Sequence, residues 1–175
     1  MPKFAVTYRG TVYPWQCDHM GHMNVMWYVG KFDEASWQLL SALGLSASRL
    51  REANAGMAAV EQYIEYKREL HAGDITTVRS TVLEVTEKAL RLLHEMRNDS
   101  TDEVVAVTGT TGVYFDASLR KARRLPSNVR MVAELMISSD DTESEESMPS
   151  VSGRLAGQAP VQHKDAVKDC STLFS

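Results

Sequence analysis

The longest regular pattern in the chain is an apolar stripe that begins after Asn24. Apolar or small side chains recur there at the spacing of one helix face: Val25, Tyr28, Val29, Phe32, Ala35, Ser36, Leu39, Leu40 and Leu43. Trp27 and Trp37 lie beside this stripe and widen it. Asn24 is a good N-cap residue, and Gly44 suits the position after the last turn. The pattern predicts a long helix over 24–43 that is apolar enough to be wrapped by other elements.

The remaining periodic segments have mostly strand character. The stretch 57–70 fits a helix nearly as well as a strand, but the turn HAGD after it and the strands beyond that turn favour a strand. Short turns at 86–88 and 99–102 predict antiparallel hairpins. The expected strands are 4–13, 57–70, 75–86, 88–98 and 103–116.

This order of elements predicts an α+β fold in which a five-stranded antiparallel sheet curls around the long helix. Short helices are expected at 46–54 and 126–135. Gly109 and Gly112 inside the last strand indicate a bulge or a close approach by another backbone or a ligand. A sheet of this size leaves an edge and a face to cover, which favours a homodimer.

Composition divides the 175 residues into two parts. We expect residues 1–137 to form one domain with sixteen acidic and sixteen basic residues, which argues against a general nucleic-acid binder. Residues 138–175 carry seven acids, three bases and few aliphatic side chains, so we expect a disordered tail. The chain has no apolar run of the roughly 18 residues that a membrane span needs. With no signal core at the start and two distant cysteines, we predict a cytoplasmic protein without a disulfide framework.

The candidate chemistry lies in PWQCDHMGHMNVMWY, residues 14–28. Asp18 is six residues before the expected helix start, where free N–H groups and the helix dipole can stabilise an oxyanion. A carboxylate beside such a site can attack a carbonyl or activate water, and Gly21 lets the backbone approach a ligand closely. The alternative is that Asp18 is only a turn or capping residue. His22 could orient Asp18 or a substrate carbonyl, or simply fix the loop.

Other chemistry is possible but has less support from the sequence. Cys17, Asp18, His19 and His22 are ligand types that suit zinc, but no second cluster completes a metal site. Cys17 as a nucleophile would need a base and a lowered pKa. Four bases in RKARR (Arg120, Lys121, Arg123 and Arg124) either anchor phosphates or form a solvated loop. We expect Asp33 and Glu34 on the polar side of the helix, and His71 and His94 at the surface or in the sheet.

The pattern D-x-x-G-H-x-N-x-x-x-Y, followed by FDEA at 32–35, resembles the hotdog-fold acyl-CoA thioesterases. Its residues are Asp18, Gly21, His22, Asn24 and Tyr28. The segments ELHAGD (69–74), HEMRN (94–98) and VYFDASLRKARRLP (113–126) are similar as well. The likeness covers about residues 4–130 and is strongest to the 4-hydroxybenzoyl-CoA thioesterase branch. It implies the hotdog fold and no metal or organic cofactor.

The resemblance also implies roles for individual residues. Asp18 corresponds to the catalytic carboxylate, acting as nucleophile or general base, and backbone N–H groups near Asn24 and Val25 would polarise the thioester carbonyl. Family members that hydrolyse 4-hydroxybenzoyl-CoA lack the His and Asn found here at His22 and Asn24, which puts the aromatic substrate in doubt. The family builds its sites at a dimer interface, often within a tetramer, and CoA phosphates commonly meet basic residues such as those of RKARR.

Three hypotheses follow from these residues. The first is a hydrolase that cleaves an acyl-CoA thioester to a free acid and CoA. The second is a non-catalytic binder of acyl-CoA or an acyl carrier. The third is a hotdog dehydratase, which needs a His paired across the subunit interface with a carboxylate on the central helix, such as His71 or His94 with Glu34.

Overall fold

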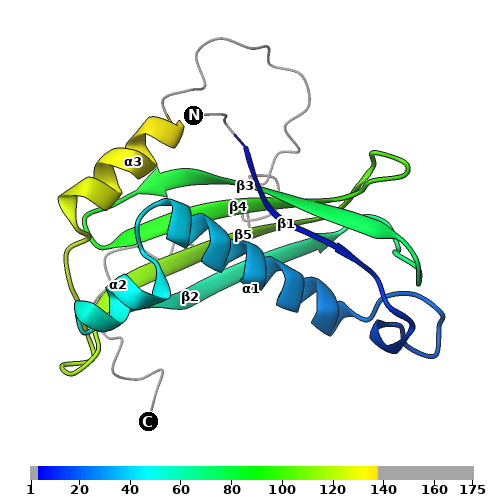
Figure 1. Ribbon diagram of the computed structural model, residues 1–175, viewed down its shortest axis with the longest axis horizontal. Coiled ribbons are helices and arrows are strands. Elements are labelled where there is room, and N and C mark those ends of the chain that lie inside the picture. The colour runs from blue at the N-terminus through cyan, green and yellow to red at the C-terminus, as the bar shows by residue number, and fades with distance from the viewer. Residues whose placement is uncertain (1–3, 138–175) are drawn as a thin grey trace, which may run out of the picture.

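The strands of the computed structural model, which describes residues 4–137, form one curled antiparallel sheet (Figure 1). The strand order is β1-β3-β4-β5-β2, and a short β6 pairs with the end of β5. The strands are β1 (Ala5–Thr11), β2 (Ala55–Tyr66), β3 (Ile75–Val85), β4 (Ala89–Asn98), β5 (Val104–Asp116) and β6 (Lys121–Ala122). The five expected strands are confirmed, including the ambiguous β2. The expected tail at 138–175 lies outside the described residues.

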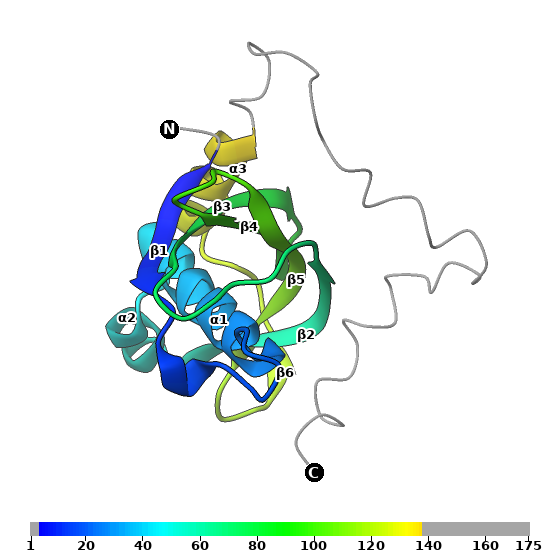
Figure 2. The ribbon, with the colours of Figure 1, turned by 90° about the vertical axis from the view of Figure 1, so that its right-hand side faces the viewer.

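The long helix α1 (Val25–Ala42) lies in the concave side of the sheet, between β1 and β2 (Figure 2). The Asn24 side chain caps it by accepting a hydrogen bond of 3.1 Å from the Met26 N–H. Gly44 follows the helix with a φ of 96°, a left-handed conformation that favours glycine. The helix and both of its predicted ends are therefore confirmed.

The sheet covers α1 on one face and not all round. Buried side chains of the helix include Tyr28, Phe32, Ala35, Leu39 and Leu40. Two residues of the expected apolar stripe, Val25 and Val29, are exposed instead. The sheet of one copy therefore wraps the helix as expected but leaves part of its N-terminal end uncovered, because the periodicity cannot tell which apolar side chains the sheet reaches.

Two apolar clusters of the described residues hold α1 to the sheet. The cluster at the start of the helix contains Val12, Met23, Tyr28, Phe32, Ala35, Leu70, Val78, Met96, Val105 and Ala106. The cluster at its other end includes side chains from α2 (Ala47–Glu52) and α3 (Ser127–Ile137). β1 pairs only with Ile75–Ser80 of β3, and α3 packs beside the rest of that strand (Figure 1). The sheet thus packs against the start of α1 through one cluster, and against the end of α1 together with α2 and α3 through the other.

A chain of buried polar groups crosses the interface between α1 and the sheet. His94 on β4 is fully buried, with Nε2 3.0 Å from Ser36 Oγ and Nδ1 2.6 Å from Ser80 Oγ. The Ser80 hydroxyl lies 2.6 Å from Thr7 Oγ1 on β1. Burial lowers the pKa of His94 to about 4. His94 is therefore a neutral residue of the sheet interior and not a surface histidine.

Gly112 of β5 lies at a bulge in the pairing of β5 with β2. The extra residue is in β2, where the register shifts between Ala59 and Glu61. A Cβ on Gly112 would lie 3.0 Å from Met57 Cε, so a side chain of β2 approaches closely there. Nothing lies within 4 Å of a Cβ built on Gly109.

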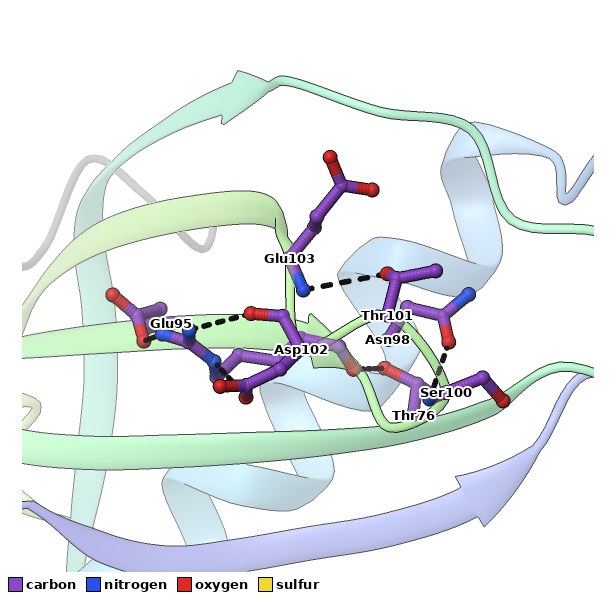
Figure 3. A network of polar contacts seen from close by, with 8 residues as sticks. Thr76, Glu95, Asn98, Ser100, Thr101, Asp102 and Glu103 are labelled. Carbon is purple, nitrogen blue, oxygen red and sulfur yellow. Dashed lines mark hydrogen bonds and ion pairs between the residues drawn. The ribbon is translucent and has the colours of Figure 1, made fainter.

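Polar contacts fix the turn between β4 and β5 (Figure 3). The Arg97 guanidinium pairs with Glu95 at 2.6 Å and with Asp102 at 3.0 Å. The Asn98 side chain accepts a hydrogen bond of 2.8 Å from the Ser100 N–H, and Asp102 adopts a left-handed φ of 54°. These contacts make the turn a defined structure.

None of the helices within residues 4–137 is long and apolar enough to cross a membrane.

The buried histidine predicts how stability depends on pH. Because the folded pKa is about 4 and the ordinary value is 6.5, the unfolded chain binds a proton in this interval that folded His94 does not. We expect the free energy of unfolding to fall by about 3 kcal/mol through this residue as the pH drops through the interval. Urea unfolding of the full chain at a series of pH values measures the slope.

The matched variants are His94→Gln, which hydrogen-bonds without titrating, and His71→Gln at an exposed histidine. His94→Gln should flatten the slope between pH 6.5 and 4, whereas His71→Gln should keep it. An unchanged slope in His94→Gln would show that His94 is not the group responsible.

Candidate active site

Residues 17–23 form a small hairpin between a short 3-10 helix (Pro14–Gln16) and the start of α1. An isolated β-bridge joins Cys17 to Met23, and the Asp18 N–H donates to the His22 carbonyl at 3.1 Å. Gly21 sits in the turn with a φ of 87°. Few other residues adopt this conformation without strain, which explains the glycine. The hairpin thus returns the chain so that Asp18 lies beside the residue that caps the helix.

The Asp18 carboxylate is held by two hydrogen bonds. Oδ1 accepts from the Met20 N–H at 2.9 Å, and Oδ2 accepts from Asn24 Nδ2 at 3.2 Å. The Met20 N–H lowers the pKa of Asp18 most, and the Asn24 amide and the charges of His22 and His19 act in the same direction. Desolvation opposes them without reversing the shift. Asp18 is therefore an oriented, ionised carboxylate at neutral pH.

The first N–H groups of α1 are not equally available to a ligand. The Asn24 N–H donates to the Gln16 carbonyl at 2.9 Å, and the Met26 N–H donates to the Asn24 side chain. The Val25 N–H has no acceptor among residues 4–137. Of the two backbone groups expected at this site, Val25 is the one free to polarise a carbonyl, while Asn24 acts through its side chain.

The His22 side chain faces the connection between β2 and β3. Its Nε2 lies 3.4 Å from Glu69 Oε1, and its ring meets the His71 ring edge to face at 6.4 Å. The Met23 N–H donates to the Leu70 carbonyl at 2.7 Å, and Tyr28 donates to the Arg68 carbonyl at 3.3 Å. Residues 68–71 therefore form a wall of the site.

Sequence reasoning did not assign this wall to the site. The segment ELHAGD (69–74) resembles the corresponding segment of the family. It lies about fifty residues after Asp18, and nothing in that separation predicts that the two are in contact. Only the tertiary structure brings Glu69 to His22.

Two other side chains of the opening segment have minor roles in this geometry. Cys17 packs against the buried cluster at the start of α1, and its thiol lies 3.9 Å from the Tyr13 carbonyl. His19 is exposed. Within the part of the chain that the structure describes, no three His, Cys, Asp or Glu side chains could hold a metal ion together.

The basic segment RKARR lies far from Asp18 within one chain. Arg123 pairs with Asp116 at 3.6 Å, and Arg124 pairs with Glu87. Lys121 belongs to β6, which was not predicted and pairs with the Asp116 end of β5, with β5 between it and the Ala55 end of β2. Asp18 lies beyond the Tyr66 end of β2. β2 has 12 residues, so about 35 Å separates its two ends. The structure therefore does not bring RKARR and Asp18 together in one copy (Figure 1).

A dehydratase is expected to pair its histidine and carboxylate across a subunit interface, and within one copy of residues 4–137 neither His71 nor His94 pairs with Glu34. Glu34 and Asp33 are exposed on α1, and the His94 ring contacts serine hydroxyls. His71 contacts the His22 ring.

Comparison with known proteins shows where this geometry occurs. Residues 12–133 match the model of the thioesterase-like superfamily. No curated protein sequence is significantly similar to the chain.

Several solved structures have the same architecture. The protein SAV2348 from Staphylococcus aureus, solved in complex with CoA, has a TM-score of 0.75 and 17% identity, covering 86% of this chain and 92% of its own. The gentisyl-coenzyme A thioesterase BH1999 has a TM-score of 0.63 and 25% identity, covering 71% and 96%. Slr0204, a 1,4-dihydroxy-2-naphthoyl-CoA thioesterase from Synechocystis, has a TM-score of 0.65 and 21% identity, covering 79% and 98%.

These likenesses agree with the curled sheet and its central helix, so the hotdog fold is confirmed. The family match covers most of the described residues, including the Asp18 hairpin, α1 and strands β2 to β6. The chain therefore belongs to the thioesterase-like superfamily and is a thioester hydrolase.

Proposed function

We propose that this protein hydrolyses acyl-CoA thioesters, with Asp18 as the catalytic carboxylate, and that it belongs to the 4-hydroxybenzoyl-CoA thioesterase-like branch. The observation that carries the proposal is the Asp18 carboxylate, oriented by Met20 and Asn24 next to the free N–H of Val25. Similar folds that bind CoA or act on CoA thioesters support the choice of substrate. The catalytic domain of this proposal is residues 1–137.

In the proposed reaction the thioester carbonyl oxygen accepts a hydrogen bond from the Val25 N–H. This contact and the positive end of the helix dipole stabilise the negative charge that develops on the oxygen. His22, held by Glu69, supports the loop that carries Asp18. The ionised state of Asp18 suits both ways in which a carboxylate can begin the reaction.

Two routes use the same carboxylate. As a nucleophile, Asp18 forms an anhydride with the acyl group and releases CoA thiolate, and water then cleaves the anhydride. As a general base, Asp18 takes a proton from a water molecule while the oxygen of that water bonds to the carbonyl carbon. The C–S bond then breaks, and the departing thiolate receives a proton. The products are a carboxylic acid and CoA in both cases.

The proposed enzyme is a homodimer formed through the free edge of β2. β2 is an end strand of the sheet, so one side of its backbone has no strand partner within residues 4–137. A second copy that pairs antiparallel to β2 satisfies these groups and extends the sheet by two-fold symmetry. Such pairing sets the Ala55 end of one β2 beside the Tyr66 end of the other.

This arrangement gives RKARR a role across the interface. The segment lies at the same end of the sheet as Ala55 of β2, one strand away across β5, and Arg123 donates to the Ala53 carbonyl at 3.2 Å. The hairpin of Asp18 lies beyond the Tyr66 end. Antiparallel pairing therefore directs the bases of one copy toward Asp18 of the partner subunit. Arg120 and Lys121 at the turn are then positioned for CoA phosphates, which guanidinium and ammonium groups bind well. Arg123 and Arg124, already paired with acids, support the segment.

Replacing Asp18 tests the chemical role. Asp18→Asn keeps the size of the side chain and removes its charge, so kcat for an acyl-CoA should fall by at least about 100-fold. Release of free thiol measures the rate, and binding of the acyl-CoA should persist.

Asp33→Asn is the matched control, because Asp33 is an exposed carboxylate on α1 away from the hairpin. Its kcat should equal that of the unaltered protein. Full activity of Asp18→Asn would reject the role of Asp18. Binding of acyl-CoA without thiol release by the unaltered protein would support a non-catalytic binder.

Mixing two variants tests the position of the basic segment. One subunit carries Asp18→Asn, and the other carries Arg120→Ala with Lys121→Ala. If the bases serve the opposite subunit, a mixed dimer has one site with both Asp18 and the bases. That site should restore the original KM, with about half of the original kcat per dimer, which steady-state thiol release measures.

A site within one subunit predicts no recovery in the mixed dimer, so that result would contradict the arrangement. Arg91→Ala, at an exposed arginine of β4, replaces the basic-segment variant as the control. This variant should leave KM unchanged on its own.

A further inference from the structure

The outer face of the sheet, opposite α1, has a hollow that is rich in arginine. This arginine hollow has a volume of about 360 Å³ and is lined by Val6, Arg9, Thr77, Arg79 and Arg97, together with two aspartates. Val6 of β1 pairs with Arg79 of β3. Thr77 of β3 has Arg9 on one side and Arg97 on the other. Arg79 is exposed between two buried neighbours in sequence, so its side chain points away from α1.

Arg79 is the cation of the arginine hollow that no carboxylate balances. It forms no ion pair within residues 4–137, and it is exposed. The acids nearby are paired with other arginines: Arg9 with Asp99 at 2.9 Å, Arg97 with Asp102 at 3.0 Å and Arg97 with Glu95 at 2.6 Å. A guanidinium with all of its N–H groups available beside a hollow suits a carboxylate ligand.

The last helix brings the chain to this place. The end of α3 lies beside the start of β1 in both views of the ribbon (Figures 1 and 2). Ala5 and Ile137 pack against the same apolar cluster, and Ala5 precedes Val6 of the arginine hollow. The chain therefore continues beyond Ile137 from a point close to the hollow.

The sequence after α3 is strongly acidic. Residues 138–147 read SSDDTESEES, with five acids, and no base follows before Arg154. The family match ends at residue 133, so this acidic segment lies beyond the family domain. Residues 140–146 are three to nine residues past Ile137, which gives them a reach of about 10 to 30 Å. That reach includes the arginine hollow along β1.

The other basic surface, RKARR, is a poorer match for this segment. It precedes α3 in the chain, and the 11 residues of α3 lead away from it over about 16 Å. Arg123 and Arg124 are also paired with Asp116 and Glu87. The acidic segment therefore meets Arg79 before it could reach RKARR.

We propose that residues 140–146 dock in the arginine hollow of their own copy, with carboxylates on Arg79 and on the exposed side of Arg9. A short connection to Ile137 keeps the acids at a local concentration in the millimolar range, so modest ion pairs are enough to hold them. Salt weakens such exposed pairs. The docked segment covers the outer face of the sheet and leaves both the Asp18 hairpin and the free edge of β2 uncovered. The proposal does not depend on the reaction that the enzyme catalyses.

Cleavage of the full-length protein by the endoproteinase Glu-C tests the docking. This protease cuts after glutamate, and the acidic segment has Glu143, Glu145 and Glu146. A synthetic peptide of residues 138–150 gives the unprotected rate at each salt concentration. At about 20 mM NaCl the segment in the protein should be cut at least about fivefold more slowly than the peptide. At about 500 mM NaCl the two rates should converge.

Charge reversal identifies the contact. Arg79→Glu should remove the protection, and so should Asp140→Arg with Asp141→Arg, each compared with the peptide of the same sequence. Combining the three substitutions restores opposite charges and should restore most of the protection. A general defect in folding would not be repaired in this way, and circular dichroism checks each variant.

Arg91→Glu is the matched control, because Arg91 is an exposed arginine of β4 that does not line the arginine hollow. It should keep the protection. A segment that is cut as fast as the peptide at low salt would overturn the docking. Equal loss of protection in Arg91→Glu and Arg79→Glu would show diffuse attraction in place of a site. Protection that rises with protein concentration would show docking on another molecule and would reject the contact within one copy.

Discussion

The structure depends on burial of one face of α1 against the concave side of the sheet. Apolar side chains from Tyr28 to Leu40 supply most of the contact area, and burial of such area is the main favourable term in folding. The hydroxyl groups that hydrogen-bond to His94 also fix the orientation of α1 on the sheet, because hydrogen bonds restrict how the helix can slide or rotate. The helix start therefore has a defined position, and the candidate site is built on that position.

The hairpin before α1 places the Asp18 carboxylate beside the start of the helix. Asn24 follows the hairpin, begins the helix and holds Asp18. The residues at 68–71 close the same loop from the sheet side through Leu70 and Glu69. The carboxylate is thus placed by contacts from two directions, which suits a group that has to be aligned before the reaction begins.

The sequence predicted those parts of the fold that local patterns determine. The long helix follows from a 3.6-residue period and two terminal residues, and the hairpin strands follow from short turns. The residues near Asp18 in sequence, from Gly21 to Val25, could be predicted for the same reason. The role of Glu69, the burial of His94 and the distance of RKARR from Asp18 depend on how distant strands pair. No spacing along the chain contains that information.

The double contact of Asn24 limits how this site can evolve. Serine, threonine and aspartate also cap helices well, but only asparagine offers both a carbonyl acceptor and an amide donor from one side chain. A serine at this position would have one hydroxyl oxygen in place of the two separate atoms that contact Met26 and Asp18, and an aspartate would set a second negative charge beside Asp18. Selection for a stable helix and selection for an aligned carboxylate therefore act on the same atoms. A substitution at position 24 therefore changes both the capping of the helix and the alignment of the Asp18 carboxylate.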